Sequence, residues 1–282
     1  MIRTVLTMIS ATAEKVGSSS VLRALPTHGL KQIDPFLLID HMVPVRIAPG
    51  ASLRIPPHPH AGFEVVTYLL DGEFFHRDSK GNDQVASAGD LNWMTSGSGI
   101  IHSEGPTGKF LQSGGRLELM QVWINLPAAK KSVSPSFRHY PGSSLPVVDN
   151  GDAWVKILIG NYGGLSSPVL THTPLFYLHI RQKAGKSLVL PVQPDYSSAL
   201  YLMGGKIGVG DQEMQPGQLA DFNKDGDQVE WKAIQDSELI FFGGLPIGEK
   251  VVSYGPFVMN SFQDIQHAVE DYETGKMGQL EY

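Results

Sequence analysis

Two pairs of side chains that could bind a metal stand in the first half of the chain. His58 and His60 form one pair, and His102 and Glu104 form the other. The members of each pair are two positions apart, and residues at i and i+2 of a strand point to the same face. If both segments are neighbouring strands, three imidazoles and one carboxylate face a common point. Three nitrogens and one oxygen form a ligand set suited to a divalent transition metal.

The same residues also fall within two short spacing motifs. Glu64 follows His60 with the His-x₃-Glu spacing of the first cupin motif, and Gly99 precedes His102 with the Gly-x₂-His spacing of the second. A glycine at this place permits the tight turn that returns a strand to a barrel. Two histidines on one strand are a weak signal alone, but the combination predicts a bound divalent metal. Spacing leaves Glu64 and Glu104 as equal candidates for the carboxylate.

Short segments rich in β-forming residues surround both motifs. Turn signals such as Asp71-Gly72 and Gly114-Gly115 separate these segments. Many short antiparallel strands at this spacing predict an all-β barrel or sandwich. The expected strands are Ala51–Ile55, Glu64–Leu70, Glu73–Arg77, Asp83–Ala86, Leu91–Thr95 and Leu117–Leu126.

The second half of the chain resembles the first. The segment Gly50–Pro56 is similar to Gly185–Pro191, Tyr68–Gly72 to Tyr201–Gly205, and Gly89–Leu91 to Gly217–Leu219, at offsets of 135, 133 and 128. Self-similarity over half the length indicates duplication of one barrel. At the offsets of these repeats, the four candidate ligands of the first half fall on Gln193, Asp195, Glu230 and Lys232. We therefore expect the second barrel to have lost the metal ligands.

Composition along the chain suggests where the two barrels meet. We expect a metal-binding barrel over residues 1–130, a linker rich in Lys, Ser, Pro and Gly over 131–152, and a second barrel over 153–282. The second barrel should end in a helix at about 261–274, because Ser261 and Asp264 have the spacing of a capping box. Ile265 and Val269 then recur on one helical face.

The composition excludes several classes of function. The chain has 282 residues, no cysteine and a net charge of −6, so thiol chemistry and cysteine-bound metals are excluded. The acidic balance argues against direct nucleic-acid binding, and no apolar run approaches the roughly 20 residues of a membrane span. We expect a cytoplasmic protein. We also expect His41, His172 and His179 to be ordinary core or surface residues.

The chain resembles the pirin family of bicupins over nearly its whole length. Ala61 departs from the residue that family members usually carry before Gly-Phe-Glu. The resemblance implies an all-β fold of two tandem cupin (jelly-roll) barrels. It also implies His58, His60, His102 and Glu104 as metal ligands, with Glu64 orienting a histidine. The residues that carry the resemblance are Asp34–Asp40, Pro56–Glu64, Asp71–Ser79, Trp93–Thr95, His102–Glu104 and Gly255–Asn260.

The resemblance also suggests two functions. Some bacterial pirin-like proteins cleave the flavonol quercetin with O₂, which implies a metal-dependent dioxygenase with a small aromatic, flavonol-like substrate. Glu104 would then be ligand and proton acceptor, with Glu64 as the second catalytic candidate. The alternative is a non-enzymatic, metal-binding regulator that acts through a protein partner. Iron is the metal associated with the family, and Mn, Ni, Co, Cu or Zn also suit these ligands.

Overall fold

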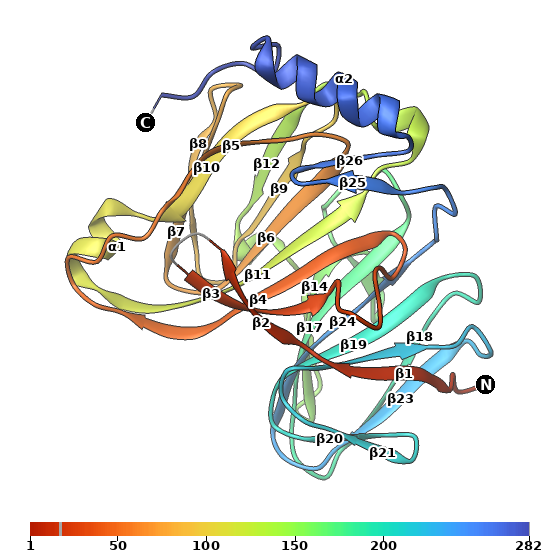
Figure 1. Ribbon diagram of the computed structural model, residues 1–282. Coiled ribbons are helices and arrows are strands. Elements are labelled where there is room, and N and C mark those ends of the chain that lie inside the picture. Colours follow the sequence, from red (N-terminus) through yellow and green to blue (C-terminus); the bar gives the residue numbers. More distant parts are fainter. Residues whose placement is uncertain (17–18, 282) are drawn as a thin grey trace. The chain divides into compact units, whose positions relative to one another are not determined.

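The computed structural model describes residues 1–16 and 19–281, and most of them lie in β-strands (Figure 1). The all-β prediction is confirmed. The chain forms two compact units, each assembled from three separate segments. Unit 1 comprises Met1–Thr12, Arg23–Leu37 and Ser144–Pro246, and unit 2 comprises Ala13–Leu22, Leu38–Ser143 and Ile247–Tyr282.

Two sheets and a hairpin carry most of unit 2. The bounds of their strands are β2 Thr12–Val16, β3 Ser19–Leu25, β4 Phe36–Ile47, β5 Ile55–His60, β6 Phe63–Asp71, β7 Glu73–Asp78, β8 Asp83–Ser87, β9 Leu91–Thr95, β10 Ile100–Pro106, β11 Gly115–Asn125, β12 Ser136–Tyr140, β25 Val252–Tyr254 and β26 Phe257–Met259. The larger sheet has the order β12-β9-β6-β11-β4-β3-β2, the smaller has β5-β10-β7-β8, and β25 pairs with β26. The helices are α1 Gly108–Ser113 and α2 Phe262–Glu273, and short 3₁₀ turns span Ala128–Lys130 and Gly142–Ser144.

Unit 1 repeats this arrangement of sheets. Its strands are β1 Val5–Ser10, β13 Val147–Asp149, β14 Ala153–Ile159, β15 Asn161–Tyr162, β16 Leu165–Ser166, β17 Leu175–Gln182, β18 Ser187–Pro191, β19 Ser197–Gly204, β20 Ile207–Val209, β21 Gln212–Met214, β22 Gln218–Phe222, β23 Gln228–Ala233 and β24 Ser237–Gly244. A seven-stranded sheet has the order β1-β22-β19-β24-β17-β14-β13, and a four-stranded sheet has β18-β23-β20-β21. The same combination of sheets in both units is the bicupin fold predicted from the repeat.

The interior of unit 1 is apolar where unit 2 carries its histidines. Buried side chains of β18 and β23 belong to one hydrophobic cluster that includes Leu188, Leu190 and Trp231. Glu230 and Lys232, the residues that the repeat matched to His102 and Glu104, are exposed on the opposite face of β23. Gln193 and Asp195 follow β18 as exposed turn residues. The match on β23 therefore places these residues on the face away from the hydrophobic cluster, because a shift by an odd number of positions moves a strand residue to the other face.

The units divide the chain differently from the expected boundaries of 1–130, 131–152 and 153–282. The N-terminal strand β1 pairs with β22 in unit 1, whereas α2 contacts β26 in unit 2. The expected linker contains β12, which pairs with β9 and is only partly buried. An edge strand of this kind lacks the apolar run that marks a central strand. The predicted helix is confirmed, since α2 follows Ser261, whose Oγ accepts from the Asp264 N–H at 3.1 Å.

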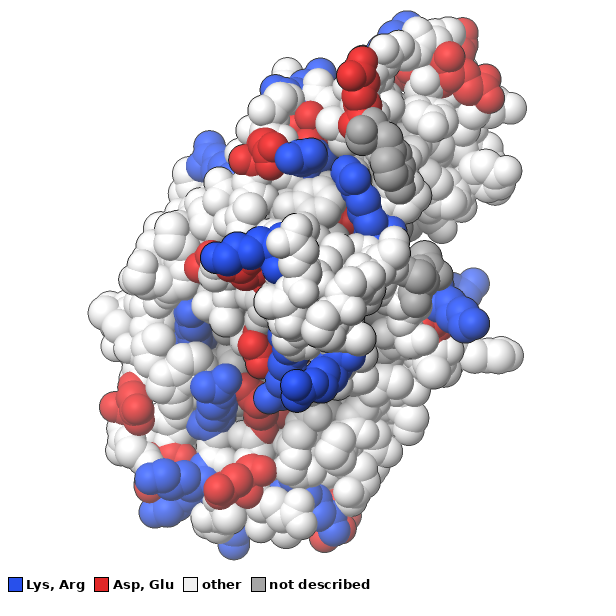
Figure 2. All heavy atoms as spheres, turned by 90° about the vertical axis from the view of Figure 1, so that its left-hand side faces the viewer, with Lys and Arg blue, Asp and Glu red and all other residues white. Residues whose placement is uncertain are grey.

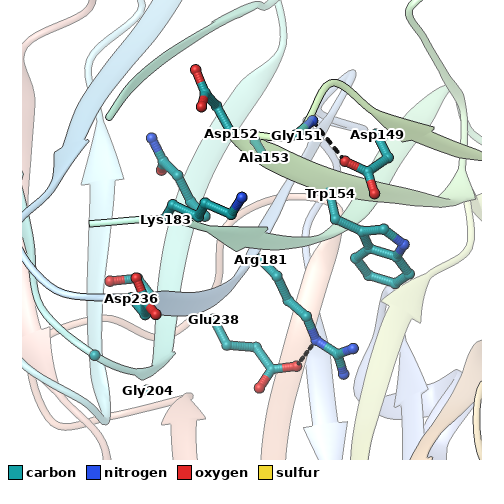
Figure 3. Close-up of a pocket in the computed structure, with 13 residues that line it drawn as sticks. Asp149, Gly151, Asp152, Ala153, Trp154, Arg181, Lys183, Gly204, Asp236 and Glu238 are labelled. Carbon is teal, nitrogen blue, oxygen red and sulfur yellow. Dashed lines mark hydrogen bonds and ion pairs between the residues drawn. The ribbon is translucent and has the colours of Figure 1, made fainter. Parts of the chain in front are cut away.

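A buried histidine–glutamate pair occurs in both units. His41 Nε2 lies 3.1 Å from Glu118 Oε1 in unit 2, and His179 Nε2 lies 2.8 Å from Glu238 Oε1 in unit 1. Arg181 donates to the same Glu238 oxygen (Figure 3) at the side of an open hollow of about 510 Å³. The expectation that His41 and His179 are structural agrees with these contacts, because each imidazole already has a carboxylate partner.

The surface carries mixed charge. On the face drawn in Figure 2, Lys and Arg side chains are interspersed with Asp and Glu. Across residues 1–16 and 19–281, no helix combines the length and apolar character that crossing a membrane requires.

Candidate metal centre

Strands β5 and β10 bring three histidines together in unit 2. The strands pair antiparallel, with His102 opposite His58 and Ile100 opposite His60. One ring nitrogen from each of His58, His60 and His102 lies within 4.8 Å of the other two. The ring centroids are 4.8 Å apart for His58 and His60, 4.3 Å for His58 and His102, and 5.0 Å for His60 and His102. These histidines could therefore hold one metal ion.

The electrostatics of the cluster favour neutral imidazoles. His60 and His102 are 4% and 1% exposed. Burial, and secondarily the neighbouring His58, lowers the pKa of His60 to about 3. Burial and the surrounding histidines also lower the pKa of His102 far below its ordinary value. Neutral imidazole has the lone pair that a metal requires, so His60 and His102 can bind a metal at neutral pH without first losing a proton.

Backbone carbonyls orient two of the three rings. His58 Nδ1 lies 2.8 Å from the Pro56 carbonyl, and His60 Nδ1 lies 3.3 Å from the Pro256 carbonyl. Because a carbonyl can only accept, each Nδ1 carries the proton and Nε2 keeps its lone pair. Neither ring nitrogen of His102 has a hydrogen-bond partner in the part of the chain that the structure describes, although both atoms are buried. A divalent metal would satisfy this costly buried group, so the residues present fit such an ion.

The Glu104 carboxylate lies beside this cluster but outside the group of nitrogens within 4.8 Å of one another. The pairing of β10 with β5 shifts between His102 and Glu104, which pairs with Ile55. The extra residue of this irregularity lies on β5, because β10 pairs with β7 without a shift. His102 and Glu104 therefore still point to the same face of β10. Glu104 is 3% exposed, and its Oε1 accepts from Gln121 Nε2 at 2.6 Å. Its role as a ligand stays a prediction.

The other carboxylate candidate, Glu64, ties two strands of the larger sheet. Its Oε1 accepts from Trp93 Nε1 at 2.9 Å and from Thr95 Oγ1 at 2.8 Å. Both donors lie on β9, whereas Glu64 lies on β6 and is 1% exposed. These bonds give Glu64 a supporting role in the sheet. Its predicted catalytic role is untested.

Sequence reasoning missed a fourth histidine next to the cluster. The His76 ring centroid lies 5.3 Å from that of His102, and the ring stacks on Phe137 at 4.0 Å. Its Nε2 lies 3.0 Å from Asp78 Oδ2, and the pKa of Asp78 is lowered by this and other hydrogen bonds against the opposing effect of burial. The signal was present, because His76 and Asp78 form an i, i+2 pair on the expected strand Glu73–Arg77 and its following residue.

The C-terminal hairpin β25–β26 also supports the centre, which the sequence alone did not indicate. The Pro256 carbonyl accepts from the Ala61 N–H as well as facing His60, and the Val258 N–H donates to the Ala61 carbonyl. Gly62 has a φ of +87°, and a Cβ there would lie 1.9 Å from the Val258 carbonyl oxygen. Only glycine fits this close approach.

Gly62→Ala should therefore destabilise the protein and weaken metal binding, because the hairpin that holds His60 must move away. Gly50→Ala is the matched control, since Gly50 has a φ of +78° but a Cβ at that position would meet no atom within 4 Å. We expect Gly50→Ala to cost about 1 kcal/mol from backbone strain alone and to leave metal affinity unchanged. Urea unfolding and metal titration would measure both effects. Equal metal affinities of the two variants would contradict the proposed support.

A buried lysine fastens the same region. Lys131 is 5% exposed, and its Nζ donates to the Gly62 carbonyl, the Asn125 side chain and the Val258 carbonyl at 2.7–3.0 Å. Burial lowers its pKa to about 8, against smaller opposing effects of Glu249 and Asp264. The lysine thus links β11, the turn after β5, and β26.

Lys131 should make stability depend on pH. Between about pH 8 and the ordinary lysine value of 10.5, the unfolded chain holds a proton that the folded protein has released. Raising the pH in this window therefore stabilises the fold, by on the order of 2 kcal/mol between pH 8 and 9.5. Urea unfolding should show this rise in the parent protein and in Lys186→Met, a control at an exposed lysine, but not in Lys131→Met. A flat profile for the parent would contradict the assignment.

Comparisons with known proteins identify the family of the chain. The Pirin family model matches residues 18–124, and the Pirin C-terminal cupin domain matches residues 177–278. A pirin-like protein of Caulobacter vibrioides is 36% identical over 273 residues, which are 96% of this chain and 93% of the relative. The chain belongs to the pirin family. The first match falls mostly within unit 2 and the second mostly within unit 1, although residues 247–278 of the second match belong to unit 2.

Solved structures resemble this pirin over most of its length. A quercetin 2,3-dioxygenase from Acinetobacter baumannii matches with a TM-score of 0.94 and 27% identity, covering 100% of both chains. A bacterial pirin from Escherichia coli in complex with nickel(II) matches with a TM-score of 0.66 and 18% identity, over 85% of this chain and 100% of that one. The second likeness concerns the fold alone.

Proposed function

We propose that this pirin is a metal-dependent dioxygenase that opens the ring of a flavonol such as quercetin with O₂. The observation that carries the proposal is the convergence of His58 with His60 and His102, whose buried imidazoles have lowered pKa values. The 27% identity and TM-score of 0.94 to a quercetin 2,3-dioxygenase support this choice of substrate and reaction.

The proposed ligands are His58, His60, His102 and Glu104, and open positions on the ion would be left for substrate and O₂. A bound divalent ion would act as a Lewis acid toward a flavonol hydroxyl oxygen and support the reaction with O₂. Iron is the first candidate. Ni, Mn, Co, Cu and Zn suit the same donor atoms.

Glu104 is the proposed proton acceptor for the flavonol hydroxyl. Its burial keeps competing water away, and the hydrogen bond from Gln121 holds one carboxylate oxygen in place. Gln121 and Trp123 are two positions apart on β11 and therefore point to the same face of the strand. We expect Trp123 to lie along the path by which the substrate reaches Glu104. The Trp123 ring lies 5.1 Å from that of His60, so it offers an aromatic wall for a flat substrate. Glu64 is the second candidate for the proton acceptor.

The proposal is tested by O₂ uptake of protein loaded anaerobically with Fe²⁺, Ni²⁺ or Mn²⁺ and then mixed with quercetin. We expect quercetin-dependent O₂ consumption with at least one metal and none with metal-free protein. If every loaded form binds its metal stoichiometrically but consumes no O₂, the dioxygenase proposal fails. The non-enzymatic regulator would then be the better interpretation.

A further inference from the structure

The outer face of α2 exposes large apolar side chains. Phe262 at the start of α2 is 72% exposed, and Tyr254 on β25 is 67% exposed. Single exposed apolar residues are ordinary, but contiguous apolar surface marks interaction sites. Tyr and Phe are also enriched in protein interfaces.

These two side chains line a hollow of about 430 Å³, which we call the α2 groove. Ile265 and Val269, one helical turn apart, complete its apolar wall, and Glu270 and Glu273 stand at its side. Ile265 is firmly held, because it packs with Ala268 in a hydrophobic cluster of unit 2. The groove is thus a built, mostly apolar surface with two carboxylates at one side.

The charge of α2 is entirely acidic apart from one histidine. The helix Phe262–Glu273 contains Asp264, Glu270, Asp271 and Glu273 and no Lys or Arg. Lys276 pairs with Asp271, whereas Glu270 and Glu273 have no ion pair within residues 1–16 and 19–281.

The two carboxylates also occupy an unfavourable place on the helix. Glu270 and Glu273 lie at the C-terminal end of α2, where the helix dipole is negative and an acidic side chain is destabilising. No basic residue occupies the last turn of the helix to offset this cost. A cationic group placed at the groove would relieve it.

We propose that the α2 groove docks a basic amphipathic segment of a partner protein. Apolar side chains of that segment enter between Phe262 and Val269, and its Lys or Arg side chains pair with Glu270 and Glu273. A second copy of this chain is a poorer occupant, because a two-fold contact would bring the carboxylates of both copies together. An anionic membrane is repelled by the same charges.

The test uses the full chain and two synthetic amphipathic helical probes, one of Leu and Lys and one of Leu and Glu. Fluorescence anisotropy would measure their binding at low and moderate salt. We expect the Leu/Lys probe to bind and the Leu/Glu probe not to bind. Phe262→Ser and the double change Glu270→Lys/Glu273→Lys should each lower the affinity for the Leu/Lys probe at least tenfold. Phe262 is so exposed that its replacement should leave the fold intact.

Two matched variants test whether the loss of any exposed aromatic residue, or the reversal of any exposed charge, weakens binding. Tyr272→Ser changes an aromatic residue of α2 that does not line the groove, and Glu230→Lys reverses an exposed charge in unit 1. Both should bind the Leu/Lys probe as the parent does. Failure of the parent to bind that probe, equal binding of the Leu/Glu probe, or equal weakening in the controls would overturn the proposal. So would a concentration-dependent dimer that Phe262→Ser abolishes, because the occupant would then be a second copy.

Discussion

His102→Ala should abolish tight metal binding while the protein stays folded. His102 is the most buried of the three clustered histidines, and neither of its ring nitrogens has a partner in the described part of the chain. Removing it takes one donor from a set of three whose nitrogens lie within 4.8 Å of one another. We expect the loss of affinity to exceed the roughly 10–100-fold that follows when only a hydrogen-bonding neighbour of a ligand is removed.

Elemental analysis and thermal unfolding with and without added Ni²⁺ would measure this effect. Metal that binds only the folded state raises the unfolding temperature, so the rise should be present in the parent protein and absent in His102→Ala. His28→Ala, at an exposed histidine, is the control and should keep the full rise. If His102→Ala retains stoichiometric metal and the same rise, the three histidines are not the metal site.

Glu104→Gln should keep metal but lose most quercetin-dependent O₂ consumption. The amide has nearly the shape of the carboxylate, and its oxygen can still accept the hydrogen bond that Gln121 donates. What the variant loses is basicity and one negative charge. At saturating metal we expect kcat to fall by about 10²–10⁴-fold, the usual contribution of a positioned proton acceptor.

Glu64→Gln is the matched comparison, because Glu64 is equally buried and accepts from Trp93 and Thr95. We expect it to lower the free energy of unfolding by about 1–3 kcal/mol, since a carboxylate that accepts buried bonds is replaced. Its kcat at saturating metal should change little. If Glu104→Gln keeps full activity and Glu64→Gln loses it, Glu64 is the proton acceptor and Glu104 is not.

The sequence predicted the histidine cluster because the geometry there is simple. His58 and His60 lie two apart on one strand, and pairing of that strand with β10 sets His102 opposite His58. The same rule places Glu104 on the face of His102, but it does not set how far the side chain reaches, and Glu104 lies outside the group of ligand atoms within 4.8 Å of one another. The duplication was visible in matching turns. Matching turns do not determine which residues of β23 point inward, so the repeat assigned exposed residues of β23 to the positions of His102 and Glu104.

Long-range supports were beyond sequence reasoning. Pro256 is placed against His60 by a hairpin far along the chain, and Lys131 reaches the Gly62 and Val258 carbonyls from the segment expected to be a linker. These contacts depend on how distant segments pair, and local pattern carries no information about that. For the same reason, the sequence did not predict that β1 belongs to unit 1 and α2 to unit 2.

The hairpin contact to His60 has a consequence for biosynthesis. During translation, all three histidines are made long before Pro256, whose carbonyl orients His60. Met277, which covers Gly99 at the start of β10 and accepts a hydrogen bond from Ser79, is made later still. A nascent chain therefore carries the donor atoms without the contacts that aim them. The geometry that holds His60 is therefore complete only after residues near the C-terminal end of α2 and beyond have been made.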